Sequence, residues 1–228
     1  MQGVILCGGR GTRLGKITEH LPKCMVEINS RPYLEIVLRE LKNRDIDNII
    51  LVIGYKKNVI KEFLERNRYF GMNIDYAEQK ELLGTGHATL CVEDKIKDDS
   101  FLSFNGDVVF DFDIINKLVI NKKPKMVVAK LDKKVNKGLV YYENNKLVRI
   151  VEHSEKEGNN INAAIYMFPK EIFNAIRNTK KSIRGEYEIT DAVNYLVERG
   201  FDFEVVETDK WADIGTLDGL KRAERLLR

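Results

Sequence analysis

The sequence contains little cysteine, no long apolar run and little net charge, and each shortage excludes a class of protein. Its three cysteines, Cys7, Cys24 and Cys91, are an odd set without Cys-x-x-Cys spacing, which argues against both a disulfide framework and a zinc site. No apolar stretch approaches the length of a membrane span. The chain passes from Met1 straight into an apolar run, without the pattern of a leader peptide. We therefore expect a cytoplasmic protein without a membrane partner.

The charges are nearly balanced and are spread along the chain. Lys and Arg total 38 and Asp and Glu total 35, which leaves a formal net charge of +3. A nucleic-acid-binding protein would show a basic patch or stripe, so we expect no nucleic-acid partner. The 228 residues, of which 43% are hydrophobic, are enough to bury the core of one large soluble domain.

The most informative segment lies at the start of the chain. An apolar run from Val4 to Cys7 leads into Gly-Gly-Arg-Gly-Thr-Arg-Leu over residues 8–14, and Pro22-Lys23 follows. Glycines permit positive φ angles and close approach of backbone N–H groups to phosphate oxygens, while Arg13 and Lys23 add positive charge. The segment lacks the third glycine of a dinucleotide fingerprint and the Gly-Lys-Ser/Thr of a P-loop. It predicts a strand that opens into an anion-binding loop of another kind.

Apolar runs alternate with amphipathic stretches in the first half of the chain, which predicts an α/β fold. Ser30 is the expected N-cap of a helix over 32–43, and Thr85 that of a helix ending at Val92. The other expected elements are strands over 48–53, 73–76, 101–104 and 125–131 and helices over 56–67 and 113–121. This order predicts a mostly parallel sheet that binds ligands at the carboxyl ends of its strands.

The second half changes in pattern. Residues 138–142 and 147–152 flank a polar turn and predict a β-hairpin. We expect a strand over 161–168, a helix from about 186 to Arg199, a strand over 201–206 and a last helix whose Leu217, Leu220 and Ala223 face the core. The fold class is thus a Rossmann-like three-layer α/β sandwich with a mostly parallel mixed central sheet and a small β-rich lobe.

The segment LCGGRGTRL…LPKCM resembles the signature of the sugar-1-phosphate nucleotidylyltransferases. Further similar segments follow in family order: QKELLGTGHA, NGD, KGLVYYENNKLVRIVEH, Asn162 and WADIGT. The chain is similar in particular to the uridylyltransferase domain that makes UDP-N-acetylglucosamine and to glucose-1-phosphate thymidylyltransferases. The resemblance implies transfer of a nucleotidyl group from a nucleoside triphosphate, with UTP favoured, to a sugar 1-phosphate, with release of pyrophosphate and with Mg²⁺ as cofactor.

The resemblance also implies roles for individual residues. The implied catalytic residues are Arg13, Lys23 and Asp107, and the implied Mg²⁺ ligands are Asp107 and Asp213. The implied nucleotide-binding residues are Leu6, Gly8, Gly9, Gly11, Thr12, Arg13, Gln79, Gly84 and Thr85. The implied sugar-binding residues are Gly138, Glu152 and Asn162, so the β-rich lobe lies on the sugar side.

These assignments describe one domain over 1–228, with a nucleotide-binding half (1–110) and a sugar-binding half (111–228). No hexapeptide repeats follow, so we expect no C-terminal β-helix domain. A homo-oligomer is left open.

Two positions depart from the pattern of relatives. Many relatives have Glu-Lys-Pro where this chain has Glu152-His153-Ser154, which removes a phosphate-binding lysine. Relatives have a glycine close after the sugar-binding Asn, and here that position is Ala164. We expect His87 to be a structural helix residue, because no nearby residue in the sequence is a clear partner for it.

The implied chemistry suits the residues present. A phosphate monoester is mostly dianionic at neutral pH, since its second pKa is about 6, so the attacking group needs no general base. Converging phosphates need positioning and positive charge instead. Open alternatives are guanylyl or thymidylyl transfer to another sugar 1-phosphate, cytidylyl transfer to phosphocholine or a similar alcohol phosphate, and a nucleotide-sensing domain without turnover.

Overall fold

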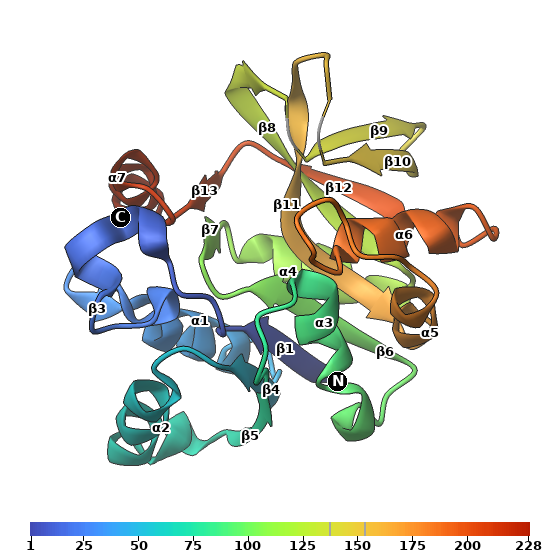
Figure 1. Cartoon of the computed structure of the whole chain (residues 1–228). Coiled ribbons are helices and arrows are strands. Elements are labelled where there is room, and N and C mark those ends of the chain that lie inside the picture. Colours follow the sequence, from blue (N-terminus) through green and yellow to red (C-terminus); the bar gives the residue numbers. More distant parts are fainter. Residues whose placement is uncertain (137, 153) are drawn as a thin grey trace.

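The computed structural model describes residues 1–136, 138–152 and 154–228, without the side chain of Thr12. These ranges contain a nine-stranded sheet in the order β5-β4-β1-β6-β11-β8-β12-β10-β9 (Figure 1). Strands β10 and β11 run against the rest, so the predicted mostly parallel mixed sheet is confirmed. The strands are β1 (Gln2–Leu6), β4 (Asn48–Ile53), β5 (Asn73–Glu78), β6 (Ser100–Asn105), β8 (Lys125–Val135), β9 (Leu139–Glu143), β10 (Lys146–Val151), β11 (Gly158–Pro169) and β12 (Glu204–Thr208).

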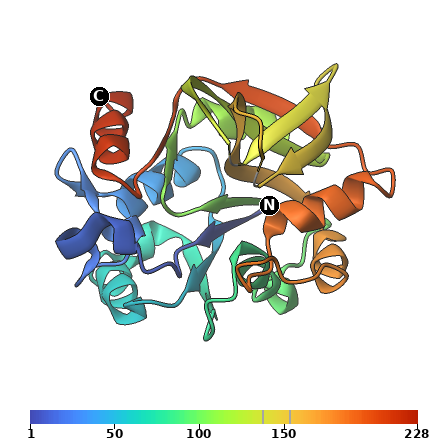
Figure 2. The same ribbon diagram turned by 45° about the horizontal axis from the view of Figure 1, so that its top comes forward.

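Helices cover both faces of the sheet, which gives the predicted three layers. One apolar core joins the sheet to α1 (Tyr33–Lys42), α2 (Lys57–Arg66), α4 (Asp113–Val119) and α7 (Leu217–Leu226). A second core joins the other face to α3 (Thr85–Leu90), α5 (Ile172–Arg177) and α6 (Ile189–Val197). Helix α7 and the β9–β10 hairpin lie on opposite sides of the molecule's upper end (Figure 2). Within the described ranges, no helix has the length and apolarity to cross a membrane.

Two short antiparallel ribbons lie outside the main sheet. Strands β2 (Glu27–Ile28) and β3 (Arg31–Pro32) form one, and β7 (Val108–Phe110) pairs with β13 (Trp211–Asp213) in the other. The second ribbon joins segments from the two halves of the chain, and it bears directly on the site described below.

Several predicted helix ends are wrong. Ser30 is not an N-cap, because it has a φ of 65° in the turn between β2 and β3, and α1 begins only after Pro32. Thr85 is the first residue of α3 rather than its cap, and its hydroxyl accepts a hydrogen bond from the Ile189 N–H at 3.2 Å. The predicted helix from residue 186 begins at Ile189.

The last helix is capped by its own sequence. The Thr216 hydroxyl accepts a hydrogen bond from the Gly219 N–H at 3.1 Å. Ala223 is buried as predicted, whereas Leu220 is half-buried and Leu217 is 61% exposed. The placement of Leu217 in the core was therefore wrong.

Local signals predicted the second-half hairpin correctly. Asn144 and Asn145 connect β9 to β10 with φ angles of 49° and 60°, as a two-residue turn with two left-handed positions requires. Strand β11 carries an irregularity between Asn162 and Tyr166, where Ala164 has a φ of 57°. A left-handed alanine inside a strand is strained, and this one lies beside the site.

Candidate active site

The segment over residues 8–14, called the glycine loop below, follows a strand in the middle of the sheet. Strand β1 lies between β4 and β6, and its end is held by the hydrogen bond from the Gly106 N–H to the Leu6 carbonyl, at 2.9 Å. Gly11 has a φ of 68°, and a Cβ there would lie 2.5 Å from Cγ of Lys23. The loop therefore needs glycine at this position because Lys23 packs directly against its backbone.

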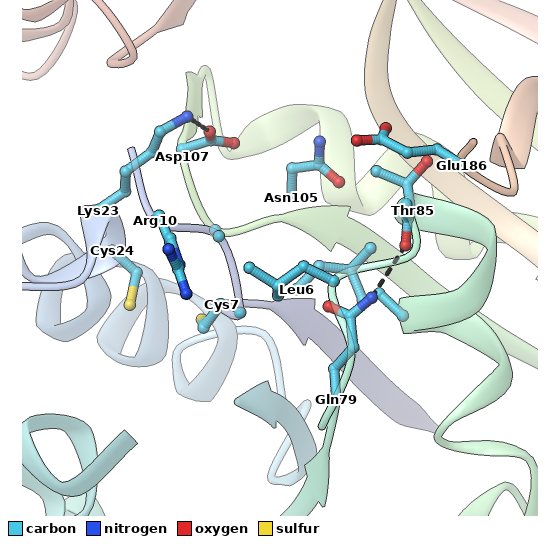
Figure 3. A pocket seen from close by; sticks show the side chains of 16 residues that line it. Leu6, Cys7, Arg10, Lys23, Cys24, Gln79, Thr85, Asn105, Asp107 and Glu186 are labelled. Atoms are coloured by element: carbon cyan, nitrogen blue, oxygen red, sulfur yellow. Dashed lines mark hydrogen bonds and ion pairs between the residues drawn. The ribbon is translucent and has the colours of Figure 1, made fainter. Parts of the chain in front are cut away.

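A first cavity of about 300 Å³ opens at the carboxyl ends of β1, β5 and β6 (Figure 3). Lys23 and Asp107 meet at one end of it, while Gln79 and Thr85 lie at the other. Its lining includes eight of the predicted residues: Leu6, Gly8, Gly9, Lys23, Gln79, Gly84, Thr85 and Asp107. It also includes Cys7, Arg10, Cys24, Leu82, Ala88, Asn105, Gly106 and Glu186.

Two predicted residues of the loop, Gly11 and Arg13, are absent from the described lining of this cavity. Gly11 packs against Lys23, and a 3-10 helix over Thr12–Thr18 follows it. The Arg13 side chain extends instead toward Asp213, with Nη2 at 3.8 Å from Oδ2.

Gln79 lies at the end of the cavity farther from the ion pair and is only 6% exposed. Its Nε2 donates to the Gly84 carbonyl at 3.0 Å and lies 3.3 Å from Nδ1 of His87. His87 lies within helix α3 as predicted, but the reason given for that prediction, the lack of a nearby partner, was wrong. The two residues are eight positions apart, and only the turn between β5 and α3 brings them together.

The segment around Gly84 packs against the chain before α6. The Tyr187 N–H donates to the Leu83 carbonyl, and the Gly86 N–H donates to the Tyr187 carbonyl, both at 2.8 Å. A Cβ on Gly84 or Gly86 would lie 2.6 or 2.8 Å from that Tyr187 oxygen. These glycines are thus required by a backbone contact that also brings Glu186 into the cavity wall.

An ion pair marks the opposite end. Lys23 Nζ lies 2.5 Å from Oδ2 of Asp107, and the two side chains are only 15% and 22% exposed. Just beyond Asp107, the buried Tyr33 hydroxyl donates to the Val108 carbonyl. Burial and the nearby Asp107 charge raise the pKa of Tyr33 well above its usual value, so the hydroxyl remains a donor and anchors the segment after Asp107.

A second cavity of about 250 Å³ adjoins the first, and the two share Asn105 and Asp107 in their walls. It is lined by the predicted residues Arg13, Asp107, Gly138, Glu152, Asn162 and Asp213, and by Asn105, Val108, Ile161, Ala164 and Trp211. The structure therefore brings the predicted sugar-binding residues and both predicted metal ligands to one place.

Backbone contacts hold the predicted sugar-binding residues together. The Gly138 N–H donates to the Glu152 carbonyl at 3.2 Å, and the Asn162 N–H donates to the Gly138 carbonyl at 2.7 Å. Oδ1 of Asn162 accepts from the Tyr166 hydroxyl and from the Ala164 N–H, at 2.8 and 2.9 Å. With its oxygen engaged, Asn162 has its amide nitrogen as a donor for a ligand. His153 lies outside the described residues.

Asp213 reaches the cavity by an unexpected route. Asp213 ends β13 in the short ribbon and not a strand of the main sheet, and it pairs there with Val108. The Ile214 N–H donates to the Asp107 carbonyl at 3.0 Å, which ties the two segments together. Oδ1 of Asp213 accepts from the Gly215 N–H at 2.7 Å.

The two carboxylates affect each other. Burial and the negative charge of Asp107 raise the pKa of Asp213, while the Gly215 N–H, Lys23 and Arg13 oppose that shift. Two carboxylates close enough to repel each other are a suitable oxygen donor set for a hard cation. Mg²⁺ commonly takes one or two carboxylates and completes its shell with phosphates and water. No group of three or more His, Cys, Asp and Glu suited to a metal occurs among the described residues.

Sequence reasoning did not identify some lining residues. Asn105 ends β6 two positions before Asp107, so the rule that strand ends face the ligand would have found it. Glu186 had no such signal, because its segment resembled helix-opening architecture. Trp211 was noted only as part of a motif, yet it lines the second cavity and its indole N–H donates to the Ala163 carbonyl at 3.0 Å.

Comparison with known proteins identifies similar sequences over the whole chain. The family described as Nucleotidyl transferase matches residues 2–228. The bifunctional protein GlmU of Methanococcus maripaludis is 38% identical over 219 residues, which cover 94% of this chain and 51% of that protein. The chain therefore spans about half the length of these curated relatives.

Two further similarities extend over nearly the full length of both partners. The UTP–glucose-1-phosphate uridylyltransferase AglF of Haloferax volcanii is 32% identical, covering 100% of this chain and 97% of that protein. A solved structure from Bacillus anthracis, described as a candidate glucose-1-phosphate thymidylyltransferase, superimposes with a TM-score of 0.87 at 28% identity, covering 100% of this chain and 95% of that one.

Proposed function

Because the chain belongs to the sugar-1-phosphate nucleotidylyltransferase family, we propose that it transfers a nucleotidyl group from a nucleoside triphosphate to a sugar 1-phosphate. UTP is the favoured triphosphate, and pyrophosphate is the second product. The observation that carries the proposal is the junction of two cavities at Asn105 and Asp107. Two substrates bound in adjoining cavities would meet there through their phosphates.

The first cavity suits the nucleotide. Its glycine-lined wall offers backbone N–H groups to phosphates, and Gln79 with the Gly84-Thr85 turn offers an amide and backbone groups to a base. We assign residues 1–110 mainly to the nucleotide and residues 111–228 mainly to the sugar. Arg13 and Glu186 are exceptions, because Arg13 lines the second cavity and Glu186 lines the first. The sequence similarity to a protein named as a UTP–glucose-1-phosphate uridylyltransferase supports the preference for UTP.

In the reaction, an oxygen of the sugar phosphate attacks the α-phosphorus, and the bond from that phosphorus to the pyrophosphate oxygen breaks in line. The attacking oxygen is already anionic at neutral pH, so no residue has to remove a proton. We assign Lys23 to the α-phosphate, where it would stabilise charge that develops as the bonds exchange. Arg13 and the glycine loop would hold the leaving pyrophosphate.

Asp107 and Asp213 fit a divalent cation, since both line the second cavity and their charges repel each other in its absence. Bound Mg²⁺ would neutralise converging phosphate charge. Asp107 keeps one oxygen on Lys23, and Asp213 is oriented through the Gly215 N–H. These contacts fix the direction in which each carboxylate presents its other oxygen.

The second cavity suits a sugar better than a choline-like alcohol. Its polar groups are the Glu152 carboxylate, the Asn162 amide and the two aspartates, which match hydroxyl groups. A quaternary ammonium is usually held by a cage of aromatic rings, and Trp211 is the one aromatic side chain in the described lining. The composition of this wall supports a sugar 1-phosphate as the acceptor.

The proposal is tested by a substrate array. The purified protein is incubated with Mg²⁺, each of four nucleoside triphosphates, and either a panel of hexose and N-acetylhexosamine 1-phosphates or phosphocholine, with release of pyrophosphate as the readout. We expect the highest rate with UTP and a sugar 1-phosphate. Turnover with CTP and phosphocholine would favour the cytidylyltransferase alternative, and binding without any turnover would favour a nucleotide sensor.

A further inference from the structure

The contact between Gln79 and His87 is not used by the proposed reaction. His87 is absent from the lining of the first cavity, whereas Gln79 is part of it. We propose that His87 is a positioning residue: it fixes the side-chain amide of Gln79 so that its oxygen, and not its nitrogen, faces the nucleobase. The inference rests on the proposed function, because it requires the base to bind beside Gln79.

The first step is the orientation of the amide. The Gly84 carbonyl can only accept a hydrogen bond, so the group 3.0 Å from it must be the Gln79 nitrogen rather than the oxygen. Turning the amide over would set two oxygens against each other. The orientation therefore follows from the chemistry of the neighbour.

The second step concerns the remaining hydrogen of that nitrogen. An amide NH₂ has two hydrogens to donate, and the second partner within reach is His87 Nδ1, at 3.3 Å. Nδ1 accepts when the imidazole is neutral and carries its proton on Nε2. Since Gln79 is only 6% exposed, water is a poor substitute for this partner, and the histidine completes the bonding of the nitrogen.

The third step concerns the oxygen. A Cβ built on Gly8 would lie 3.0 Å from Oε1 of Gln79, so the oxygen lies against the glycine at the cavity wall. Both Gly8 and Gln79 line the first cavity. With its nitrogen engaged twice, the amide presents an acceptor to the bound base.

An acceptor at this position selects among bases by their edges. Uracil and thymine carry an N–H at ring position 3, and guanine carries one at position 1, whereas cytosine and adenine carry a bare nitrogen acceptor there. A fixed acceptor oxygen accepts a hydrogen bond from uracil, thymine or guanine, whereas it faces a second acceptor in cytosine or adenine and is repelled by it. Discrimination by a site that leaves polar groups unpaired with the wrong ligand is strong. His87 would thus support a preference for UTP over CTP without touching the nucleotide.

Without an acceptor at position 87, one N–H of Gln79 loses its partner. The Gly84 carbonyl is then the one remaining partner that holds the amide, so an alternative orientation with an N–H toward the cavity, where the bare ring nitrogen of cytosine accepts it, costs less than in wild type. Leaving a buried donor unsatisfied is costly, and a tenfold change in the ratio corresponds to about 1.4 kcal/mol. We expect the ratio of kcat/KM for UTP to that for CTP to fall by about tenfold in His87→Leu.

Two matched variants separate positioning from packing. In His87→Asn the side-chain oxygen occupies the place of Nδ1 and can still accept, so the base ratio should stay within about threefold of wild type. In His87→Gln the acceptor moves to the place of Nε2, away from Gln79, so the ratio should fall as in His87→Leu. Each ratio is measured with one sugar 1-phosphate, and urea unfolding of each variant checks that the proteins are folded.

A ratio that drops in His87→Leu and His87→Gln but holds in His87→Asn supports the proposal. Equal ratios in all four proteins would overturn it, as would a drop in His87→Asn equal to that in His87→Leu. If wild type turns over no triphosphate, the proposed function fails. Equilibrium binding constants of UTP and CTP for the same four proteins then test the positioning role separately, by the same criteria.

Discussion

Neutralising Asp107 and neutralising Asp213 should have opposite effects on stability, although both should abolish most activity. Asp107 is paired with Lys23 at 2.5 Å, and the lysine side chain is only 15% exposed. Asp107→Asn leaves that ammonium without its countercharge. Asp213 has Arg13 only at 3.8 Å and is repelled by Asp107, so Asp213→Asn removes a repulsion.

The magnitudes follow from burial. Removing one member of a fully buried ion pair lowers the free energy of unfolding by about 3–5 kcal/mol. An exposed pair contributes only about 0–1 kcal/mol to it. Lys23 and Asp107 lie between these limits, and we expect Asp107→Asn to lower the free energy of unfolding by about 2 kcal/mol. The Asp213 side chain is 34% exposed, so solvent screens its repulsion, and Asp213→Asn should gain at most about 1 kcal/mol.

The pH dependence gives a second test of the same reasoning. A carboxyl whose pKa is raised in the folded state holds its proton more tightly when folded. The contribution of Asp213 to the stability of wild type should therefore fall as the pH rises from the ordinary Asp value of 3.8 through the raised pKa of Asp213. The Asp213→Asn variant lacks this contribution, so the free energy of unfolding of the variant minus that of wild type should increase over that range.

Urea unfolding without Mg²⁺, between about pH 4 and pH 8, measures both effects. Asp132→Asn is a suitable control, because Asp132 is 91% exposed and its pairing with Arg222 is loose, at 3.7 Å. It should change the free energy of unfolding by less than about 0.5 kcal/mol. Equal losses in the two active-site variants, or a larger loss in Asp213→Asn, would refute the assignment of Lys23 to Asp107.

Three further predictions concern the loop, the lysine and the strained alanine. Lys23→Ala should depress kcat more than it raises KM for the triphosphate, and the reverse pattern in steady-state kinetics would make it a ground-state contact. The Tyr55 N–H donates to the Gly8 carbonyl and its hydroxyl to the Glu19 carbonyl, at 3.2 and 2.7 Å. Tyr55→Phe should therefore loosen the glycine loop and raise KM for the triphosphate about fivefold, and an unchanged KM would exclude this anchoring role. Ala164→Gly should raise the free energy of unfolding by about 0.5–1 kcal/mol in urea, because glycine tolerates its φ of 57°, and destabilisation would show that the position is not strained.

Much of the fold follows from local signals. Each strand of the parallel part is a short apolar run, and the hairpin turn at Asn144 and Asn145 has residue types that tolerate two left-handed positions. The strand ends then place the glycine loop, Gln79 and Asp107 at one edge, as the parallel topology requires. These features depend on neighbours in sequence, so the sequence is sufficient to predict them.

The predictions from sequence fail where a contact with a distant segment of the chain determines the role of a residue. Thr85 has the composition of a cap, but its hydroxyl bonds to the backbone of Ile189, which comes from the other half of the chain. Asp213 is positioned by the pairing of β13 with β7, and no local pattern reveals which three-residue strands will pair. His87 has a partner only because the turn after β5 folds back over it.

The most direct test of the proposed reaction is the fate of labelled phosphate. The enzyme is supplied with Mg²⁺, a sugar 1-phosphate and UTP labelled either at the α-phosphate or at the γ-phosphate, and the products are separated. Transfer at the α-phosphorus predicts that the α label appears in a nucleotide sugar and the γ label in pyrophosphate, in equal amounts, and that Lys23→Ala loses both. Appearance of the γ label in inorganic phosphate, or of the α label in free UMP or UDP with no nucleotide sugar, would contradict it.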